Sequence, residues 1–222
     1  KETKADVGFT VDPDVDRLAM VCEDGSMFGE EYTLVAVADY VLNHTPGSTV
    51  SNLSSTRALR DVTEGKGEVY HASAVGEVNV VSLMKQTKAV IGGEGNGGII
   101  YPESHYGRDA LVGIALFLSH LALKKCKTSQ LRDSFPKYCI SKNKIQLTPD
   151  INVDDVLTQM ADKYSGEEVD TTDGVKIYIE KEWVHLRKSN TEPIIRIYSE
   201  SESMAAANAL ANRIKGDINT FI

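Results

Sequence analysis

The chain has 222 residues, of which 41% are hydrophobic and 25% are charged, which is typical of a folded domain and excludes disordered, collagen-like and disulfide-scaffolded proteins. The formal net charge of −8 argues against a nucleic-acid-binding protein, which would carry a basic face. The cysteines Cys22, Cys126 and Cys139 are widely spaced, and the sequence shows no signal peptide. We therefore expect reduced thiols, a cytoplasmic location and no association with membranes.

The first half of the chain alternates short apolar strands with helices. Strands are predicted at residues 7–11, 18–21, 48–53, 68–71 and 88–91, and helices at residues 32–42, 55–63, 78–86 and 109–124. The apolar run at residues 111–123 is too short to span a bilayer and is interpreted as a buried helix. Helices that alternate with buried strands predict a three-layer α/β sandwich around a mostly parallel sheet.

The pattern changes after about residue 125. Polar connectors lead to a predicted strand at residues 138–147 and to a helix whose apolar positions run at helical spacing from Val153 to Tyr164. Strands at residues 175–179, 183–187 and 194–198 follow, and then a helix at residues 202–218, for which Ser199 and Glu202 offer a capping box. Successive strands flanked by helices predict a separate, small α+β domain at the C-terminal end.

Three carboxylates, Asp12, Asp14 and Asp16, alternate along an acidic turn between the first two predicted strands. Carboxylates at this spacing can converge on one hard cation, and Arg17 adds a fork suited to a phosphate beside it. The first thirty residues hold eight acidic and three basic side chains, which is −5 of the net −8. An EF-hand loop is disfavoured, because Arg17 stands where that loop needs glycine, Pro13 stands at its second position and the flanks are predicted strands. A solvated acidic turn is the alternative.

A glycine-rich segment, residues 92–98, follows the fifth predicted strand. It contains the spacing G-x-G-x-x-G, but no helix is predicted directly after it, which disfavours a dinucleotide-binding site. Glu94 and Asn96 place an acceptor and an amide on a closely approachable backbone, which suits vicinal sugar hydroxyls. A tight surface turn is the alternative.

A third polar segment, residues 187–193, links two predicted strands. Its cations, hydroxyls, amide and backbone N–H groups suit a phosphate, and a further arginine follows in the next strand. A polar hairpin loop is the alternative. The candidate phosphate ligands are Arg187, Ser189, Asn190, Thr191 and Arg196.

Taken in this order, the three segments resemble those of the α-D-phosphohexomutases, the family of phosphoglucomutase, phosphomannomutase and phosphoglucosamine mutase. Residues 12–17 are similar to the family's metal loop, residues 93–98 to its sugar-recognition loop and residues 187–193 to its RxSNTEP phosphate loop. Residues 73–77 resemble its T-x-V-G-D segment more loosely, and Val78 stands where a basic residue is common.

The resemblance implies four domains around one cleft. Residues 1–28 would be the tail of domain 2 with the metal loop, residues 29–125 domain 3, and residues 126–222 a linker and domain 4. The phosphoserine would lie in N-terminal domains outside this chain, which are its implied partners. The implied reaction interconverts hexose 1-phosphate and hexose 6-phosphate through a hexose 1,6-bisphosphate, and we expect this chain alone to be inactive.

The resemblance also implies roles for the motif residues. Asp12, Asp14 and Asp16 would bind Mg²⁺, and Arg17 would act in catalysis on the transferring phosphoryl group. Glu94 and Asn96 would bind the sugar hydroxyls. The group that would bind the phosphate of the phosphosugar comprises Arg187, Ser189, Asn190, Thr191 and Arg196. A non-enzymatic phosphosugar or metal-binding module and a calcium-binding structural domain are the competing hypotheses.

Overall fold

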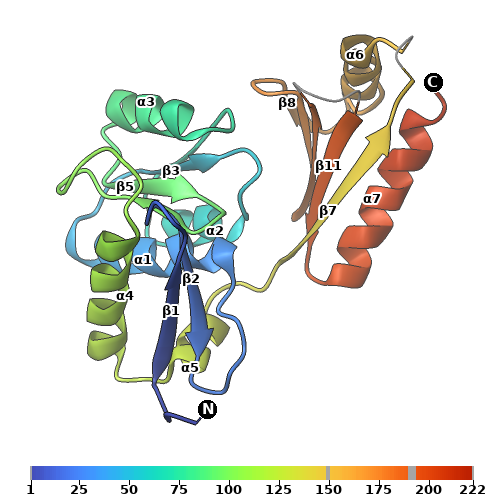
Figure 1. Ribbon diagram of the computed structural model, residues 1–222. Coiled ribbons are helices and arrows are strands. Elements are labelled where there is room, and N and C mark those ends of the chain that lie inside the picture. Colours follow the sequence, from blue (N-terminus) through green and yellow to red (C-terminus); the bar gives the residue numbers. More distant parts are fainter. Residues whose placement is uncertain (1, 149–150, 190–193, 222) are drawn as a thin grey trace. The chain divides into compact units, whose positions relative to one another are not determined.

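The computed structural model describes residues 2–148, 151–189 and 194–221. The chain divides into an N-terminal unit, Lys1–Pro136, and a C-terminal unit, Lys137–Ile222 (Figure 1). The strands of the N-terminal unit are β1 (Val7–Val11), β2 (Leu18–Cys22), β3 (Thr49–Asn52), β4 (Tyr70–Ser73), β5 (Ile91–Glu94) and β6 (Gly98–Ile100). Its helices are α1 (Glu30–His44), α2 (Ala58–Glu64), α3 (Glu77–Thr87), α4 (Ala110–Lys124) and α5 (Thr128–Asp133).

Four strands of the N-terminal unit form one sheet, in the order β4-β3-β5-β6. Strand β3 pairs in parallel with β4 and β5, and β6 runs antiparallel to β5. Helix α3 packs on one face of this sheet, and α1 and α2 lie on the other (Figure 1). The sequence-based prediction of a three-layer α/β sandwich is therefore confirmed.

The chain passes from β3 to β4 on one side of it, and then crosses back to form β5 on the other side of β3. A crevice is expected outside the carboxyl ends of β3 and β5, because the crossover connections on either side of that point diverge. Asn52 is the last residue of β3, and Glu94 is the last residue of β5. The topology thus brings Glu94 to the place where α/β sheets bind ligands.

Strands β1 and β2 form a separate antiparallel hairpin that contains the acidic turn. Phe9 of β1 and Phe28 lie edge-on to the ring of Phe117 in α4, with ring centroids 6.2 and 5.2 Å away. Leu18 and Met20 of β2 are buried. The hairpin is therefore packed onto the sandwich, and the acidic turn is held beside the sheet.

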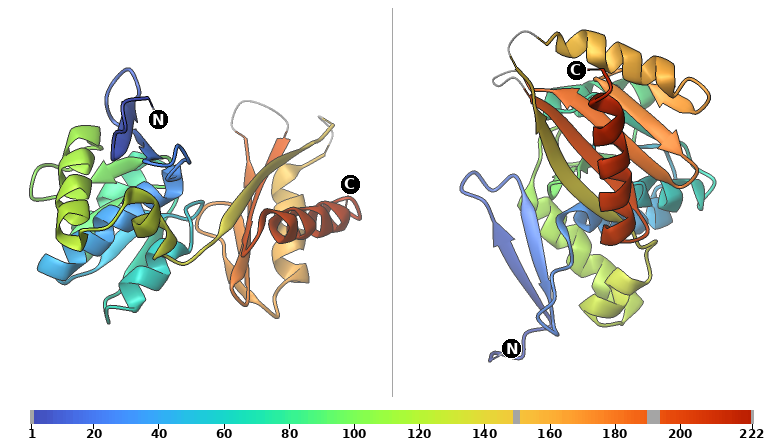
Figure 2. Two further views of the ribbon diagram at one scale, coloured as in Figure 1. Left: turned by 90° about the horizontal axis from the view of Figure 1, so that it is seen from below. Right: turned by 90° about the vertical axis from the view of Figure 1, so that its right-hand side faces the viewer.

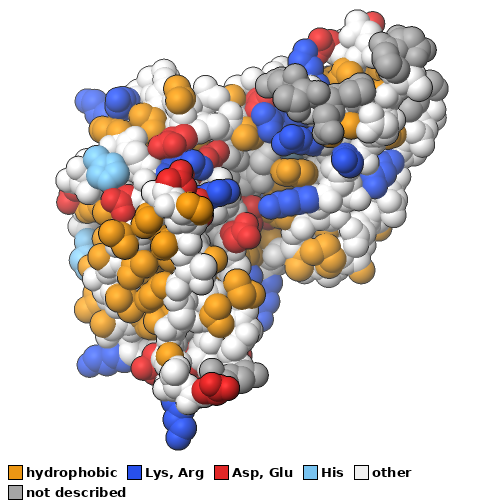
Figure 3. Space-filling model, viewed as in Figure 1, with side chains coloured by type: hydrophobic (Ala, Val, Ile, Leu, Met, Phe, Trp, Pro, Cys, Tyr) orange, Lys and Arg blue, Asp and Glu red, His pale blue; other side chains and the backbone are white. Residues whose placement is uncertain are grey.

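Helix α4 begins at Asp109, whose side chain accepts hydrogen bonds from the backbone N–H groups of Leu111 and Val112. One side of α4 is buried, but Leu111, Leu118 and Leu123 are 63%, 43% and 62% exposed. The prediction of a buried helix here is wrong for that side, because no described element covers it. Figure 3 shows apolar side chains in orange over this part of the surface. No described helix has the length and apolar character needed to cross a membrane.

The C-terminal unit has the strands β7 (Cys139–Gln146), β8 (Glu168–Asp170), β9 (Val175–Ile179), β10 (Glu182–Lys188) and β11 (Ile194–Ser201) and the helices α6 (Val153–Lys163) and α7 (Met204–Ile218). The strands form one antiparallel sheet in the order β7-β11-β10-β9-β8. Both helices lie on the same face of this sheet, over a core that includes Val184, Ile197 and Ile214 (Figure 2). The predicted separate α+β domain is confirmed.

Several elements differ from their predicted bounds. Strands β4 and β5 begin two and three residues later than predicted, so β5 includes the first glycines of the glycine-rich segment. Strands β6 and β8 and helix α5 were not predicted, because they are too short to show a hydrophobic period. The predicted capping box is wrong: Ser199 lies inside β11, and α7 is capped by Ser203, whose side chain accepts from the N–H of Ala206.

Candidate functional site

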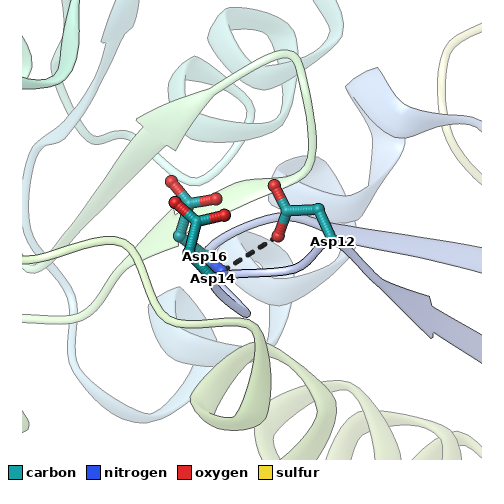
Figure 4. A group of neighbouring side chains, drawn as sticks. All are labelled: Asp12, Asp14 and Asp16. Carbon is teal, nitrogen blue, oxygen red and sulfur yellow. Dashed lines mark hydrogen bonds between the residues drawn. The ribbon is translucent and has the colours of Figure 1, made fainter.

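The acidic turn between β1 and β2 gathers its three aspartates. Asp12, Asp14 and Asp16 lie close together, with one carboxylate oxygen of each within 4.8 Å of the others (Figure 4). The turn folds around Asp12, whose Oδ1 accepts hydrogen bonds from the backbone N–H groups of Asp16 and Arg17, both at 3.1 Å. The spacing seen in the sequence therefore produces one compact cluster of oxygen ligands.

Val15, at the centre of the turn, has a φ of +60°. This left-handed conformation is rare for a β-branched residue and costs on the order of 1–3 kcal/mol. The Val15 N–H donates to the carbonyl of Asp12 at 3.1 Å, and the Val15 carbonyl accepts from the N–H of Ala110, also at 3.1 Å. The start of α4 thus holds the turn in its strained shape.

The charges of the cluster are balanced by two arginines. The Nε of Arg17 lies 2.6 Å from Oδ2 of Asp12, and this hydrogen bond holds the pKa of Asp12 well below its usual range. Burial raises the pKa of Asp16, to which its hydrogen bond with Asp12 adds, while Arg108 opposes the rise. Asp12 is therefore ionised, and a nearby cation would favour the charged form of Asp16.

The donor set of the cluster fits a small divalent cation. Oδ1 of Asp16 is buried, has no hydrogen-bond partner among the described residues, and lies 3.7 Å from Nε of Arg17. A buried carboxylate oxygen that accepts no hydrogen bond is stabilised when a cation approaches it more closely than Arg17 does. Mg²⁺ and Ca²⁺ both prefer carboxylate oxygens, so Asp12, Asp14 and Asp16 would hold such an ion.

Glu94 is buried, with 5% of its surface exposed. Its Oε1 accepts hydrogen bonds from Nδ2 of Asn52 at 2.8 Å and from the backbone N–H of Gly76 at 3.3 Å. Its Oε2 accepts from Nη1 of Arg108 at 2.7 Å and from Nδ2 of Asn96 at 3.4 Å. These four donors fix the carboxylate and use its four lone-pair sites, so a ligand hydroxyl would replace one of the two longer contacts, from Gly76 or Asn96.

The acidic turn and the glycine-rich segment are joined by their backbones. The N–H of Leu18 donates to the carbonyl of Gly97 at 3.1 Å, and Arg17 forms an isolated bridge with Gly98. Gly97 has a φ of +87°, and a Cβ there would collide with the carbonyl of Leu18, so glycine is required. A pocket of about 240 Å³ is lined in part by Asp12, Arg17 and Asn96. The structure therefore brings these residues together.

The third predicted segment lies in the C-terminal unit, at the end of the β10–β11 hairpin. Arg187 and Arg196 stand directly opposite each other, and Lys144 of β7 stands opposite Arg196 on its other side. Nε of Arg187 lies 2.9 Å from Oδ2 of Asp173. Like charges opposite each other repel, and a bound anion relieves that repulsion. Figure 3 shows Lys and Arg side chains, in blue, gathered on this unit.

The other predicted residues of this segment are only partly described. The N–H of Ser189 donates to the carbonyl of Ile194 at 3.0 Å, which closes the base of the loop. Asn190 and Thr191 lie outside the described residues.

Sequence reasoning did not identify three polar residues around Glu94. Asn52, at the end of β3, and Arg108, in the segment before α4, stand in no recognised motif. Glu77, at the start of α3, ends the loosely matching segment 73–77, for which no role was predicted. Only the sheet order could have indicated Asn52, since it ends the strand beside β5. Arg108 places a positive charge against Glu77, next to the position where Val78 replaces the basic residue common in the related family.

Comparison with known proteins agrees with this geometry. Residues 29–138 match the profile described as "Phosphoglucomutase/phosphomannomutase, alpha/beta/alpha domain III", and residues 143–216 match "Phosphoglucomutase/phosphomannomutase, C-terminal domain". The chain belongs to the phosphoglucomutase/phosphomannomutase family. The resemblance expected from the three segments is thereby confirmed.

Individual members of the phosphoglucomutase/phosphomannomutase family match most of the chain. A protein of Thermococcus kodakarensis, named phosphoglucomutase/phosphomannomutase, is 35% identical over 205 residues, which cover 91% of this chain and 45% of that protein. The chain spans about half the length of the curated relatives it matches.

Solved structures of the family share the fold. A phosphoglucomutase/phosphomannomutase family protein from Burkholderia thailandensis superposes with a TM-score of 0.84 at 26% identity and covers 99% of this chain and 48% of its own. N-acetylphosphoglucosamine mutase from Aspergillus fumigatus superposes with a TM-score of 0.71 at 13% identity, covering 95% of this chain and 51% of its own. At that identity the likeness concerns the fold alone.

Proposed function

We propose that this chain is the C-terminal part of a phosphohexomutase that interconverts hexose 1-phosphate and hexose 6-phosphate through a phosphoserine and a hexose 1,6-bisphosphate. Residues 1–28 would be the tail of its second domain, residues 29–125 its third domain, and residues 126–222 a linker and its fourth domain. The phosphoserine would belong to the half of the relatives that this chain does not match. The observation that carries the proposal is the cluster of Asp12, Asp14 and Asp16, joined by backbone hydrogen bonds to the segment that holds Glu94.

The aspartate cluster is proposed to bind Mg²⁺. The A. fumigatus mutase was solved in complex with GlcNAc-6P and magnesium. Here the support comes from the buried Oδ1 of Asp16, which accepts no hydrogen bond from the described residues and lies 3.7 Å from Arg17, and from the converging carboxylates. When bound, Mg²⁺ offsets the negative charge of a phosphoryl group during transfer. Arg17, whose side chain is 51% exposed beside the cluster, would bind an oxygen of that phosphoryl group.

The sugar is proposed to bind at Glu94 and Asn96. Asn52 and Arg108 hold the carboxylate of Glu94 in place, and vicinal hydroxyls would replace its two longest contacts, from Gly76 at 3.3 Å and Asn96 at 3.4 Å. Oδ1 of Asn96 is engaged by the N–H of Gly98 at 3.1 Å, which orients its amide. A fixed acceptor suits a reaction in which the sugar must bind in two orientations, because hydroxyl groups can both donate and accept.

The phosphate that does not react is proposed to bind in the C-terminal unit, at Arg187, Ser189, Asn190, Thr191 and Arg196. Two arginines opposite each other on neighbouring strands give two planar forks, which match phosphate oxygens bidentately. Moving a phosphoryl group between the two ends of a sugar requires that the phosphate at the other end be held in place. A phosphate-binding site separate from the metal cluster would do this.

The metal assignment is tested by titrating Mn²⁺, a spectroscopically visible substitute for Mg²⁺, into this chain and into two variants. Asp14→Asn is expected to weaken Mn²⁺ binding at least about tenfold, because one carboxylate ligand loses its charge. Asp24→Asn is the matched control, since Asp24 is also exposed and bonds to Ser26 in the turn after β2, outside the aspartate cluster. Equal affinity in the wild type and Asp14→Asn would exclude the proposed site.

The enzymatic assignment is tested with glucose 1-phosphate, mannose 1-phosphate and glucosamine 1-phosphate, each assayed with a catalytic amount of its bisphosphate. This chain is expected to bind a phosphosugar without turning it over. Turnover by the chain alone would refute the proposal that the phosphoserine lies in the half of the relatives that this chain does not match. A whole protein that carries this chain, binds phosphosugars and never isomerises them would favour the alternative of a non-enzymatic binding module.

A further inference from the structure

Arg108 stands where three segments of the N-terminal unit meet. Its Nη2 pairs with Oδ2 of Asp16, its Nη1 lies 2.7 Å from Oε2 of Glu94, and its Nε lies 3.3 Å from Oε2 of Glu77. The side chain is 19% exposed. One guanidinium therefore contacts carboxylates from the acidic turn, the glycine-rich segment and the start of α3.

The contacts of Arg108 need the arginine fork. Nη2, Nη1 and Nε each lie beside a different carboxylate, and a lysine ammonium presents no such planar set of nitrogens. The backbone N–H of Arg108 also donates to Oε1 of Glu77 at 3.0 Å, which fixes the origin of the side chain. Without the guanidinium, Asp16, Glu77 and Glu94 would repel one another in a partly buried place.

Gly98 provides the space that the Arg108 side chain occupies. A Cβ at position 98 would collide with Cδ of Arg108 and lie 3.2 Å from its Cγ. The same glycine forms the bridge to Arg17 in the acidic turn. Any side chain at position 98 must therefore displace the guanidinium from the carboxylates.

We propose that Arg108 is a positioning residue, whose guanidinium fixes Asp16 of the metal cluster and the sugar-binding carboxylate of Glu94 relative to each other. Gly98, which has no side chain, leaves the room that the Arg108 side chain needs. The proposal rests on the function proposed above for Asp16 and Glu94. Arg108 pairs with Oδ2 of Asp16 and leaves Oδ1 for the cation. Since it also pairs with Glu94, one guanidinium orients a carboxylate in the metal site and a carboxylate in the sugar site. Its positive charge also opposes the cation, which makes the metal affinity lower than three aspartates alone would give.

Two measurements on this chain test the proposal. Hydrogen exchange reports the N–H of Leu18, which bonds to Gly97, and the N–H of Gly76, which bonds to Glu94. Mn²⁺ titration reports the cluster. Arg108→Met is expected to speed both exchanges at least about tenfold, because the carboxylates separate, and to tighten Mn²⁺ binding about tenfold, because a positive charge beside Asp16 is removed. A variant that only destabilised the fold would weaken Mn²⁺ binding.

Four further variants make the test more specific. Arg108→Lys keeps the charge without the fork, so exchange is expected to accelerate while Mn²⁺ affinity stays near that of the wild type. Gly98→Ala keeps Arg108 but displaces it, so it is expected to act like Arg108→Met, and the double variant should add nothing to either. Arg60→Met is the matched control, since Arg60 pairs with Glu64 along α2 and is an arginine outside the proposed site.

The outcomes separate this proposal from the proposed function. Unchanged exchange in Arg108→Met and Gly98→Ala, or Mn²⁺ binding that is unchanged or weaker in Arg108→Met, overturns the positioning role. A wild-type chain that binds no Mn²⁺ refutes the metal assignment and the effect of Arg108 on metal affinity. Faster hydrogen exchange at Gly76 in Arg108→Met would still support the proposal that Arg108 positions Glu94. If Arg108→Met does not fold, Gly98→Ala with its intact arginine decides the question.

Discussion

His185 should make the stability of the C-terminal unit depend on pH. It lies in β10, is 1% exposed, and its Nε2 stands 2.6 Å from the carbonyl oxygen of Asp173, to which the neutral ring donates. The pKa of His185 falls from 6.5 to about 4, mainly because burial disfavours the charged ring; the hydrogen bond to Asp173 opposes this fall, and the positive charges of Lys176 and Arg187 add to it. The folded unit therefore resists protonation of this ring.

The size of the effect follows from the two pKa values of His185, 6.5 when unfolded and about 4 when folded. Between these values only the unfolded chain binds the proton, so the stability is complete above pH 6.5 and is lost as the pH falls toward 4. Each unit of pKa difference corresponds to about 1.4 kcal/mol, which gives a loss of about 1 kcal/mol between pH 7.5 and 5.5 and about 3 kcal/mol by pH 4.

The assay is urea unfolding followed by the fluorescence of Trp183. This is the single tryptophan of the chain and lies in the same strand as His185, so its signal reports the unfolding of the C-terminal unit. The reference variant is His185→Gln, which keeps an N–H donor but does not titrate. We expect the free energy of unfolding of the wild type to fall by about 1 kcal/mol more than that of the variant between pH 7.5 and 5.5. Parallel pH profiles for the two proteins would refute the reasoning.

Three further predictions concern the sites and the core. Val15→Gly should raise the free energy of unfolding of the N-terminal unit by about 1 kcal/mol, measured by calorimetry, because glycine adopts the φ of +60° without strain. Gly92→Ala should lower that free energy by about 1–3 kcal/mol, since its Cβ would lie 2.5 Å from Sδ of Met84 in the packed layer under α3. Arg187→Ala should weaken phosphosugar binding at least about tenfold in titration calorimetry, because a charge-assisted hydrogen bond to phosphate contributes roughly 1.5–3 kcal/mol.

Each of these predictions has a result that would contradict it, and the first and third also have a control variant. Val11→Gly, in the extended strand β1, should destabilise the same unit, and a loss of stability in both valine variants would mean that the turn is not strained. An unchanged melting temperature for Gly92→Ala would show that α3 can shift away from β5. Arg213→Ala on α7 removes the same side chain from the helical face, so an equal loss of phosphosugar binding there would argue against a specific clamp at Arg187.

The family relationship could be read from the sequence because its motifs are local. Asp12, Asp14 and Asp16 converge through a turn of five residues, so their spacing alone predicts a cluster. The strands and helices with clear hydrophobic periods were also predictable, as were the two classes of fold. Short elements such as β6 were not, since three residues carry no period and their pairing with β5 decides their conformation.

The sequence by itself determined the candidate ligands, the two fold classes and the alternation of elements, since these depend on neighbours within a few residues. Only the tertiary structure decided what surrounds those ligands. The order β4-β3-β5-β6 places Asn52 beside Glu94, and the start of α4 carries Arg108 to Asp16 and Glu94. These contacts join residues separated by fourteen to ninety-two positions, a distance over which chain topology and packing, rather than local pattern, set which groups meet.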